Sequence, residues 1–294
     1  MRPNPPIVVF VDVEGVLRDR PRPSFAAAAS TLKLLARDEV PLVLCSSRTR
    51  AEIEHLQQEL GITHHPFISE NGGAAFVPAG YFAAGVPSAR EVAGYWAVEF
   101  GRPYAAVVDT LHRTAERLRI EVRGFSDMSV EEVARECHLP LLQARLAKLR
   151  EYEELFYILD PSPSARSRLF KALHAQHLRC ISGHRYDHVG APVDNGVGVE
   201  LLGTLYRRAF GPMLTVGLAA PLAEGRLLQL VDYPVIVQHD EANATPRLLK
   251  KASTTHLIAA DNEAGWAEAI VDIVARLRGR FTQSSFVTAA RDDQ

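Results

Sequence analysis

Two acidic residues follow the first apolar run of the chain, where their side chains could do chemistry. In "IVVFVDVEGVL" (residues 7–17), five apolar residues lead into Asp12, and Glu14 follows before a turn at Gly15. A short apolar run predicts a buried strand, which would deliver Asp12 to the rim of a sheet. A carboxylate at that place is typical of a catalytic strand. Glu14 has one methylene more than Asp, and it could equally be a solvated acid at a strand end.

A second group of polar residues follows the next apolar run. The stretch "VPLVLCSS" (residues 40–47) predicts a strand that ends at Ser46, with Ser47 and Arg48 beside it. In parallel sheets, ligands bind outside the carboxyl ends of the strands. We therefore expect Asp12 and Ser46 at the same edge.

The loop "SENGG" (residues 69–73) is a third candidate for that edge. It would bring Glu70, Asn71 and several backbone amides near the mouth of the site. The alternative is a plain hairpin turn, because Gly-Gly pairs mark turns.

The elements that position these residues alternate between strand and helix. Helices are predicted over 24–39 and 49–61, the second ending at Gly61, between short apolar strands. This alternation predicts a doubly wound parallel sheet.

The alternation of strands and helices stops near residue 80 and resumes with "NGVGVELLGTLYRRAF". Between them lies a mixed segment, in which Ser129 and Glu132 fit a capping box. The sequence therefore predicts an α/β fold with a core of residues 1–80 and 184–294. Residues 81–183 would form an inserted α+β cap.

Composition excludes several classes of partner. The 294 residues carry a net charge of −2 and no run of Lys or Arg, which argues against a nucleic-acid partner. No stretch approaches the length of a membrane helix. The three cysteines form no pair motif and no zinc spacing, so we expect a reduced, cytoplasmic protein.

Five sequence blocks resemble those of mannosyl-3-phosphoglycerate phosphatases, in the haloacid dehalogenase (HAD) superfamily. They are "SSRTRAEI", "FISENGGA", "GFSDMSVEEVA", "ARLAKLREYEE" and "HRYDHVGAPVDNG". With the strand that ends in Asp12, the resemblance extends to about residue 237. It implies a HAD-like, Rossmann-type core with a cap. It also implies a phosphatase that acts on a small phosphorylated sugar or glycerate metabolite.

The resemblance assigns roles to residues of this chain. Asp12 would attack phosphorus and form an aspartyl-phosphate, and Glu14 would take the acid/base position, where the family has Asp. Ser46, with Ser47 and Arg48 beside it, would bind the phosphate. The family's magnesium ion would be held by Asp12, the Glu14 carbonyl and Glu224.

Several motif positions depart from the family pattern, and most departures remove charge. The family's phosphate-binding Lys is Asn195 here, and the stretch that carries the magnesium carboxylates reads "GLAAPLAEG", with Ala220 at the first Asp and Glu224 at the last. Magnesium usually takes one or two carboxylates from a protein, so this donor set is a poor cage. Arg185, His188 or Arg48 could supply the missing charge, or each could be a surface polar group.

Three functions are compatible with this pattern. One is a phosphatase with weakened activity. The second is a catalytically inactive HAD-fold protein that binds a metabolite or regulates a partner. The third, chemistry at carbon without magnesium, has no positive support in the sequence.

Overall fold

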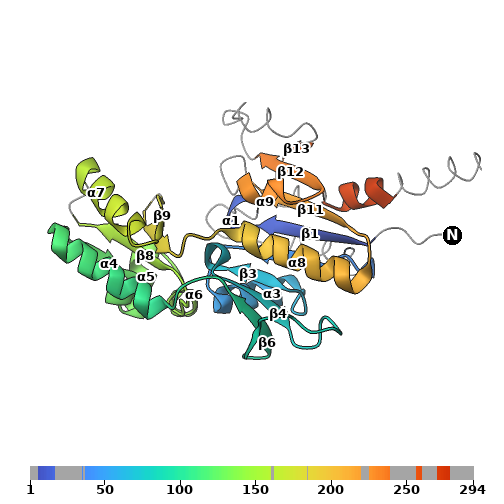
Figure 1. The fold of residues 1–294 in the computed structure, drawn as a ribbon, viewed down its shortest axis with the longest axis horizontal. Helices are drawn as coiled ribbons and strands as arrows, with labels where there is room; N and C mark the ends of the chain where they lie inside the picture. The colour runs from blue at the N-terminus through green and yellow to red at the C-terminus, as the bar shows by residue number, and fades with distance from the viewer. Residues whose placement is uncertain are drawn as a thin grey trace, which may run out of the picture.

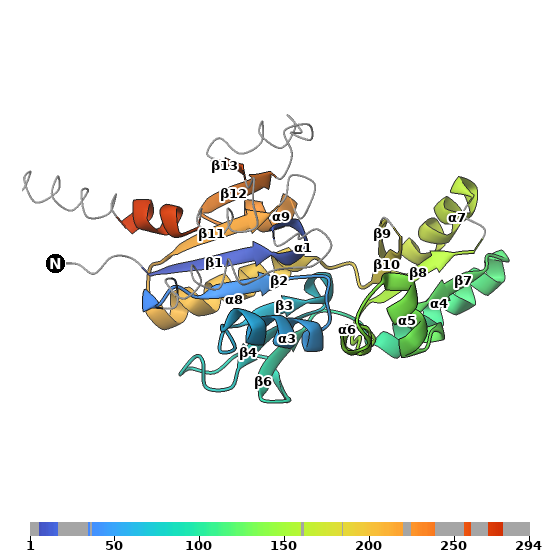
Figure 2. The same ribbon diagram turned by 180° about the vertical axis from the view of Figure 1, so that it is seen from behind.

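The computed structural model describes residues 6–16, 35, 37–159, 162–183, 185–219, 225–238, 256–259 and 270–278. Within these ranges the chain forms a large and a small sheet, each with its own helices (Figure 1). Seen from behind in Figure 2, the two parts lie side by side. No helix in these ranges is long and apolar enough to cross a membrane.

The large sheet is parallel over most of its width. Its parallel strands are, in spatial order, β13 (His256–Ala259), β12 (Tyr233–Gln238), β11 (Leu214–Ala219), β1 (Ile7–Asp12), β2 (Leu42–Cys45) and β3 (Phe67–Ser69). Its antiparallel strands follow as β4 (Ala74–Pro78), β6 (Tyr95–Glu99) and β5 (Arg90–Val92). The predicted α/β fold is confirmed. The sheet is mixed rather than wholly parallel, because the "ENGG" turn folds β4 back along β3.

Helices cover both faces of the large sheet, because side chains alternate along each strand. In β1, Val9 packs in one hydrophobic core with α3 (Arg50–Leu60) and the helical residues 270–278. Phe10 points the other way and packs with α8 (Asn195–Phe210). Both residues are fully buried. This two-sided cover is the predicted doubly wound arrangement.

The small sheet forms the cap and is antiparallel throughout. Its order is β7 (Val122–Gly124), β8 (Glu154–Ile158), β10 (Asp187–Gly190) and β9 (Arg179–Ile181). One hydrophobic core joins it to α4 (Tyr104–Leu118) and α7 (Pro163–His174). A second core contains residues of α5 (Val130–Cys137) and α6 (Leu141–Ala147).

Sheet membership shifts the limits of the two domains. The prediction places 81–183 in the cap, yet β5 and β6 extend the large sheet and β10 belongs to the small one. Short strands pair with whichever sheet edge they reach, and the local sequence does not reveal which edge that is. We therefore propose that the cap lies between Glu99 at the end of β6 and Gly190 at the end of β10.

Two helix boundaries carry the signals that the sequence contains. At the start of α5, the Ser129 side chain accepts from the Glu132 amide, and the Glu132 side chain accepts from the Ser129 amide. This is the predicted capping box. Helix α3 ends at Gly61, which has a left-handed φ of 71°.

Candidate active site

Asp12 and Ser46 meet at one edge of the large sheet. Asp12 is the last residue of β1 and lies in register with Cys45, the last residue of β2. Ser46 follows directly, and both Asp12 and Ser46 are buried. The structure thus places these two residues at the shared edge, where the sequence predicts them.

The Glu14 carboxylate is held by the loop that follows β2. Ser46 Oγ donates to Glu14 Oε1 at 2.6 Å, and the Ser47 amide donates to Oε2 at 3.1 Å. Arg48 Nε lies 3.5 Å from Oε1. We call Asp12, Glu14, Ser46, Ser47 and Arg48 the catalytic edge. Both oxygens of Glu14 are engaged, so the longer side chain is fixed by its neighbours.

The geometry of Ser46 bears on its predicted phosphate contact. A hydroxyl has one hydrogen to donate, and that of Ser46 is directed to Glu14. The same oxygen accepts from the Arg48 amide at 3.1 Å. A phosphate bound by the Ser46 hydroxyl would therefore compete with Glu14 for this hydrogen.

The turn Glu70–Gly72 lies against the catalytic edge and against the start of α8. Glu70 and Asn71 both adopt left-handed φ values, 47° and 54°. The Asn71 amide donates to the Ser46 carbonyl at 2.9 Å. Gly72 has φ of 90°, and a Cβ there would lie 2.1 Å from the Asp194 carbonyl oxygen. Only glycine fits this close approach. The loop is the hairpin turn between β3 and β4, and it lies beside Ser46; its role in a site stays a prediction.

Buried charges join this turn to the cap. The Glu70 side chain is fully buried and accepts from the amides of Glu151, Tyr152 and Glu153 at 2.8–3.0 Å. Arg150 Nε lies 3.6 Å from Glu70 Oε2. Burial raises the pKa of Glu70 to about 7, although Arg150 and the three amides oppose that rise.

Glu153 extends the same set of contacts. Asn71 Nδ2 donates to both of its oxygens, and His188 Nδ1 and Arg150 Nη2 lie 3.0 and 3.1 Å from Oε2. Burial opposes the charged form of Glu153, but His188, Arg150 and Asn71 hold its pKa below the usual value. We call Glu70, Asn71, Arg150, Glu153 and His188 the junction network. His188 lies here as a partner of a buried carboxylate.

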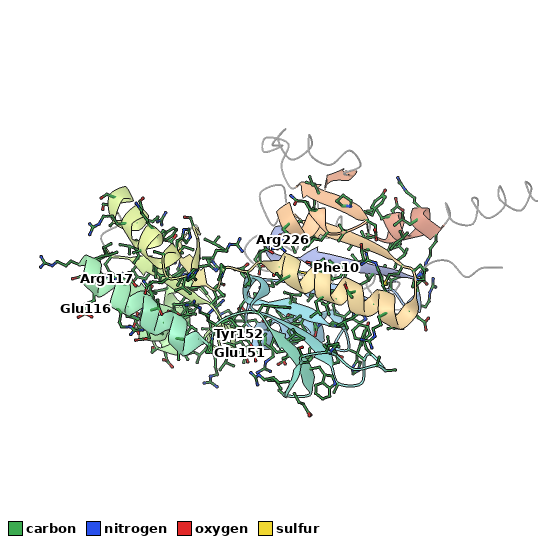
Figure 3. The ribbon with its side chains drawn as sticks, in the orientation of Figure 1. Phe10, Glu116, Arg117, Glu151, Tyr152 and Arg226 are labelled. Carbon is green, nitrogen blue, oxygen red and sulfur yellow. The ribbon has the colours of Figure 1, made fainter. Side chains whose placement is uncertain are left out.

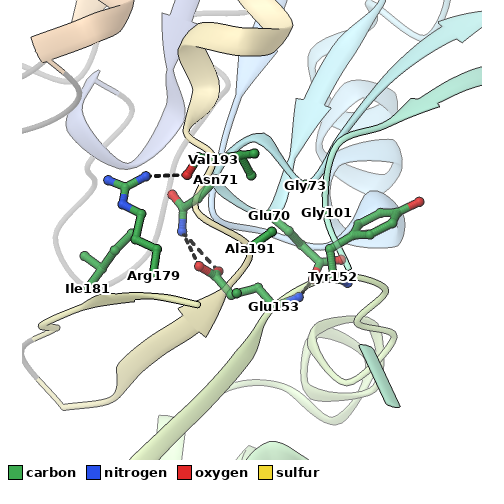
Figure 4. A pocket seen from close by; sticks show the side chains of 11 residues that line it. Glu70, Asn71, Gly73, Gly101, Tyr152, Glu153, Arg179, Ile181, Ala191 and Val193 are labelled. Carbon is green, nitrogen blue, oxygen red and sulfur yellow. Dashed lines mark hydrogen bonds between the residues drawn. The ribbon is translucent and has the colours of Figure 1, made fainter. Parts of the chain in front are cut away.

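A pocket opens beside the junction network (Figure 4). Its empty volume is about 270 Å³, part of it open to solvent. Gly73 and Gly101 shape one wall, since a Cβ on either would come within 2.8 Å of the Tyr152 side chain. Arg179 of β9 reaches across from the cap, and its Nη1 donates to the Val193 carbonyl at 2.6 Å.

The start of α8 carries Asn195, which the resemblance places at the position of the family's Lys. Asp194 caps the helix and accepts from the Gly196 amide at 2.9 Å. Asn195 is 1% exposed, and its Oδ1 has no hydrogen-bond partner among the residues that the structure describes. Arg226, in α9 (Gly225–Gln229), lies over this turn, with Nη1 3.6 Å from Asp194 Oδ1. Figure 3 shows Arg226 at the end of α8 that faces the cap.

The described contact of Arg185 lies in the cap, and its predicted role in binding phosphate stays a prediction. Its guanidinium lies over the Tyr186 ring, 5.7 Å from the centroid, and Tyr186 donates to Glu136 of α5. These contacts all belong to the cap. Glu224 and Ala220 lie outside the described residues, so the predicted metal contact of Glu224 stays a prediction.

The described residues do not assemble a magnesium cage. They contain no group of three or more His, Cys, Asp and Glu side chains that could hold a metal ion. The Glu14 carboxylate accepts from Ser46 and Ser47 and faces Arg48, so its backbone carbonyl and Asp12 are the predicted donors that the structure describes. Magnesium needs near-octahedral oxygen ligands, and these two donors alone do not meet that requirement.

Sequence reasoning missed Arg150, Glu153 and Arg226 as site residues. The first two lie inside the block "ARLAKLREYEE", which served only to identify the family. Their burial depends on contacts with the distant turn at Glu70, which no local pattern reveals. Arg226 follows directly after "GLAAPLAEG". A cation beside a stretch with Ala220 in place of its first carboxylate was a usable signal.

Known proteins with extended sequence similarity to this chain include two phosphatases of the same name. The chain is 34% identical over 271 residues to the glucosyl-3-phosphoglycerate/mannosyl-3-phosphoglycerate phosphatase of Methanococcoides burtonii, covering 92% of this chain and 97% of that protein. It is 33% identical over 235 residues to the protein of the same name from Persephonella marina, covering 79% and 85%. No protein-family model matches the chain.

Solved structures share the fold at low sequence identity. A haloacid dehalogenase-like hydrolase from Bacteroides thetaiotaomicron has a TM-score of 0.64 at 16% identity, covering 91% of this chain and 99% of that one. A HAD subclass IIB sugar phosphatase has a TM-score of 0.58 at 13% identity, covering 90% and 98%. These likenesses show the arrangement of a core and a cap.

Proposed function

Because the chain belongs to the glucosyl-3-phosphoglycerate/mannosyl-3-phosphoglycerate phosphatase family of the HAD superfamily, we propose that it hydrolyses a phosphate monoester of a glycosylated glycerate. The names of the two relatives supply this substrate class. Its mannosyl form is also the one that the sequence blocks imply. We place the reaction in the cytoplasm, in keeping with the sequence prediction.

In the proposed reaction, Asp12 attacks phosphorus and the bond to the sugar-glycerate oxygen breaks. Glu14 gives its proton to that leaving oxygen. Glu14 then removes a proton from water, the water oxygen attacks phosphorus, and the bond to Asp12 breaks to release inorganic phosphate. Asp12 supports this role because it is buried at the carboxyl end of β1, where ligands bind in such sheets.

One observation carries the proposal: Ser46 and Ser47 hold the Glu14 carboxylate. Misplacement of a catalytic group by about 1 Å can cost about a hundredfold in rate. A Glu in place of Asp risks that misplacement, and two hydrogen bonds from the neighbouring strand end limit it. A solvated Glu without a role would not need both of its oxygens fixed.

The altered positions predict a slow enzyme. Asn195 brings no charge and Ala220 brings no ligand. Each missing electrostatic partner can cost roughly 3 kcal/mol in the transition state. Two such losses would slow the reaction by about four orders of magnitude if they added, which such effects rarely do.

The test is phosphate release from mannosyl-3-phosphoglycerate and glucosyl-3-phosphoglycerate, with a broad phosphoester panel beside them. We expect slow turnover that Asp12→Asn abolishes, because the nucleophile is then gone. Magnesium is varied in the same assay. Folded protein that releases no phosphate from any of these compounds would refute the proposal.

A second function is favoured by the same missing charges. A protein with Asn195 and Ala220 could bind the metabolite in the cleft without turning it over. In that case the sugar-phosphate would raise the melting temperature while no phosphate appeared. Turnover that depends on Asp12 would rule this alternative out.

A further inference from the structure

The start of α8 lacks a charge at position 195 but has a cation beside it. Asn195 stands at the first turn of the helix, flanked by Asp194 and Gly196. Arg226 contacts both flanking residues. Its Nη1 lies 3.6 Å from Asp194 Oδ1, and a Cβ built on Gly196 would lie 2.8 Å from Arg226 Cγ. Its aliphatic stem therefore packs directly on the Gly196 backbone.

The Arg226 guanidinium keeps donors for a ligand. Its side chain is 46% exposed, and the ion pair with Asp194 occupies one side of it. A guanidinium has five N–H donors in a planar fork, so it can face a carboxylate and a phosphate at the same time. Arginine is also the side chain best suited to bidentate contact with phosphate.

Asn195 gives an independent reason to look for a ligand at this turn. Its side chain is almost fully buried, yet its Oδ1 has no hydrogen-bond partner among the described residues. That oxygen accepts hydrogen bonds, so it favours a ligand that carries a donor, such as a hydroxyl, beside its phosphate. The first amides of a long helix and its dipole favour an anion at the same place. An amide side chain adds no charge to them, so the charge has to come from a neighbour.

Other cations near the cleft have their contacts at other places. Arg48 faces Glu14, Arg150 is buried between Glu70 and Glu153, and Arg179 donates to the Val193 carbonyl. Arg185 lies over Tyr186 in the cap. Among the residues that the structure describes, Arg226 is the cation that contacts both neighbours of Asn195.

We infer that Arg226 supplies the positive charge that faces the substrate's phosphoryl group, in place of a cation at position 195. The inference rests on the proposed function for the location of the phosphoryl group. The cation that binds phosphate would then come from α9, the helix that follows the altered "GLAAPLAEG" stretch, rather than from α8. The inference also makes Arg226 a phosphate-binding residue that sequence reasoning had not selected.

The test compares Arg226→Met with a matched control, Arg207→Met. Arg207 also lies 3.6 Å from an aspartate, Asp232, and is 45% exposed, but it belongs to the last turn of α8. The readout is binding of inorganic phosphate by calorimetry, which needs no turnover. We expect Arg226→Met to weaken phosphate binding at least tenfold and Arg207→Met to leave it unchanged. Arg226→Lys should retain most of it.

A charge-relocation variant separates charge from packing. Adding Asn195→Lys to Arg226→Met should restore phosphate binding to within a few-fold of the unchanged protein. Equal binding by Arg226→Met and the unchanged protein would overturn the inference. So would an equal loss in Arg207→Met, no restoration by the added Lys, or no phosphate binding by the unchanged protein.

The two proposals can fail separately. If the unchanged protein turns over no substrate but its phosphate binding depends on Arg226, the inference stands and the proposed reaction falls. If turnover needs Asp12 but phosphate binding does not depend on Arg226, the proposed reaction stands and the inference about Arg226 falls.

Discussion

The junction network and the catalytic edge lie next to each other but differ in how deeply their charged side chains are buried. In the junction network, Glu70, Arg150 and Glu153 are almost fully buried, and each contacts several partners. At the catalytic edge, Glu14 and Arg48 are each more than a third exposed, and their N–O distance is 3.5 Å. The charges that join the core to the cap are thus buried, whereas the charged pair that would meet a substrate is open to solvent.

This difference shows where the chain departs from its family. Asn195, one altered position, stands at the start of α8, and Ala220, the other, follows β11 in the sequence. The residues of the junction network are not among the altered positions. Arg150 Nη2 also donates to the Ser47 carbonyl at 3.0 Å. The intact network therefore supports the loop that holds Glu14, even though the cleft has lost charge.

The largest effect should come from breaking the junction network. Arg150→Met would leave Glu70 and Glu153 buried without their cation, and removing one partner of a buried pair costs about 3–5 kcal/mol. The free energy of unfolding, measured in urea, checks this loss. The matched variant at the catalytic edge is Arg48→Met. It should cost less than about 1 kcal/mol, because its pair with Glu14 is exposed.

Similar losses in the two variants would show that the buried network is no more important for stability than the exposed pair. The contrast between the two regions would then be one of geometry alone. A loss in Arg48→Met as large as the one predicted for Arg150→Met would also show that the catalytic edge is a structural element.

The sequence predicts the parts of the site that depend on local patterns. Apolar runs locate the ends of β1 and β2, so the meeting of Asp12 and Ser46 follows from the parallel-sheet rule. The residue that holds Glu14 is one of those predicted to bind phosphate, Ser46, but its hydrogen bond could not be foreseen. Strand ends are fixed by periodicity, while side-chain partners depend on packing.

Contacts between distant segments are what the sequence could not provide. Asn71 and Glu153 are 82 positions apart, and their hydrogen bond depends on how the cap docks onto the core. For the same reason, Arg185 looked like a candidate cation for the cleft. The sequence alone does not say where a basic side chain beside a motif lies in the folded protein. Here the fold brings Arg226 to the start of α8.

A smaller effect is expected when the cleft regains a family carboxylate. Ala220→Asp would return one oxygen ligand after β11, and one electrostatic partner is worth roughly 3 kcal/mol. Phosphate release in the presence of magnesium should become about a hundredfold faster by that estimate. The magnesium concentration that gives half-maximal rate should also fall.

Gln229→Asp is the control for this gain. It adds the same charge to an exposed position of α9, at the far end of that helix from Arg226. Equal rates in the two variants would show that net charge, rather than a ligand at position 220, limits the reaction. If neither variant changes the rate, another residue limits phosphate release, and Asn195 would be substituted next.

The smallest effect concerns the pH dependence of the junction network. Burial raises the pKa of Glu70 to about 7 from its ordinary value of 4.5, so the folded protein binds more protons than the unfolded chain between these values. Stability from this group is therefore present at low pH and is lost as pH rises toward 7 and beyond. One proton of difference corresponds to at most about 1.4 kcal/mol per pH unit.

Glu153, whose pKa is lowered, acts in the opposite direction, so only a comparison with Glu70→Gln isolates the Glu70 contribution. Urea midpoints from pH 5 to pH 8 should fall more steeply for the unchanged protein than for Glu70→Gln. Parallel curves would mean that Glu70 is ionised throughout and that the Arg150 cation and the three amides outweigh its burial.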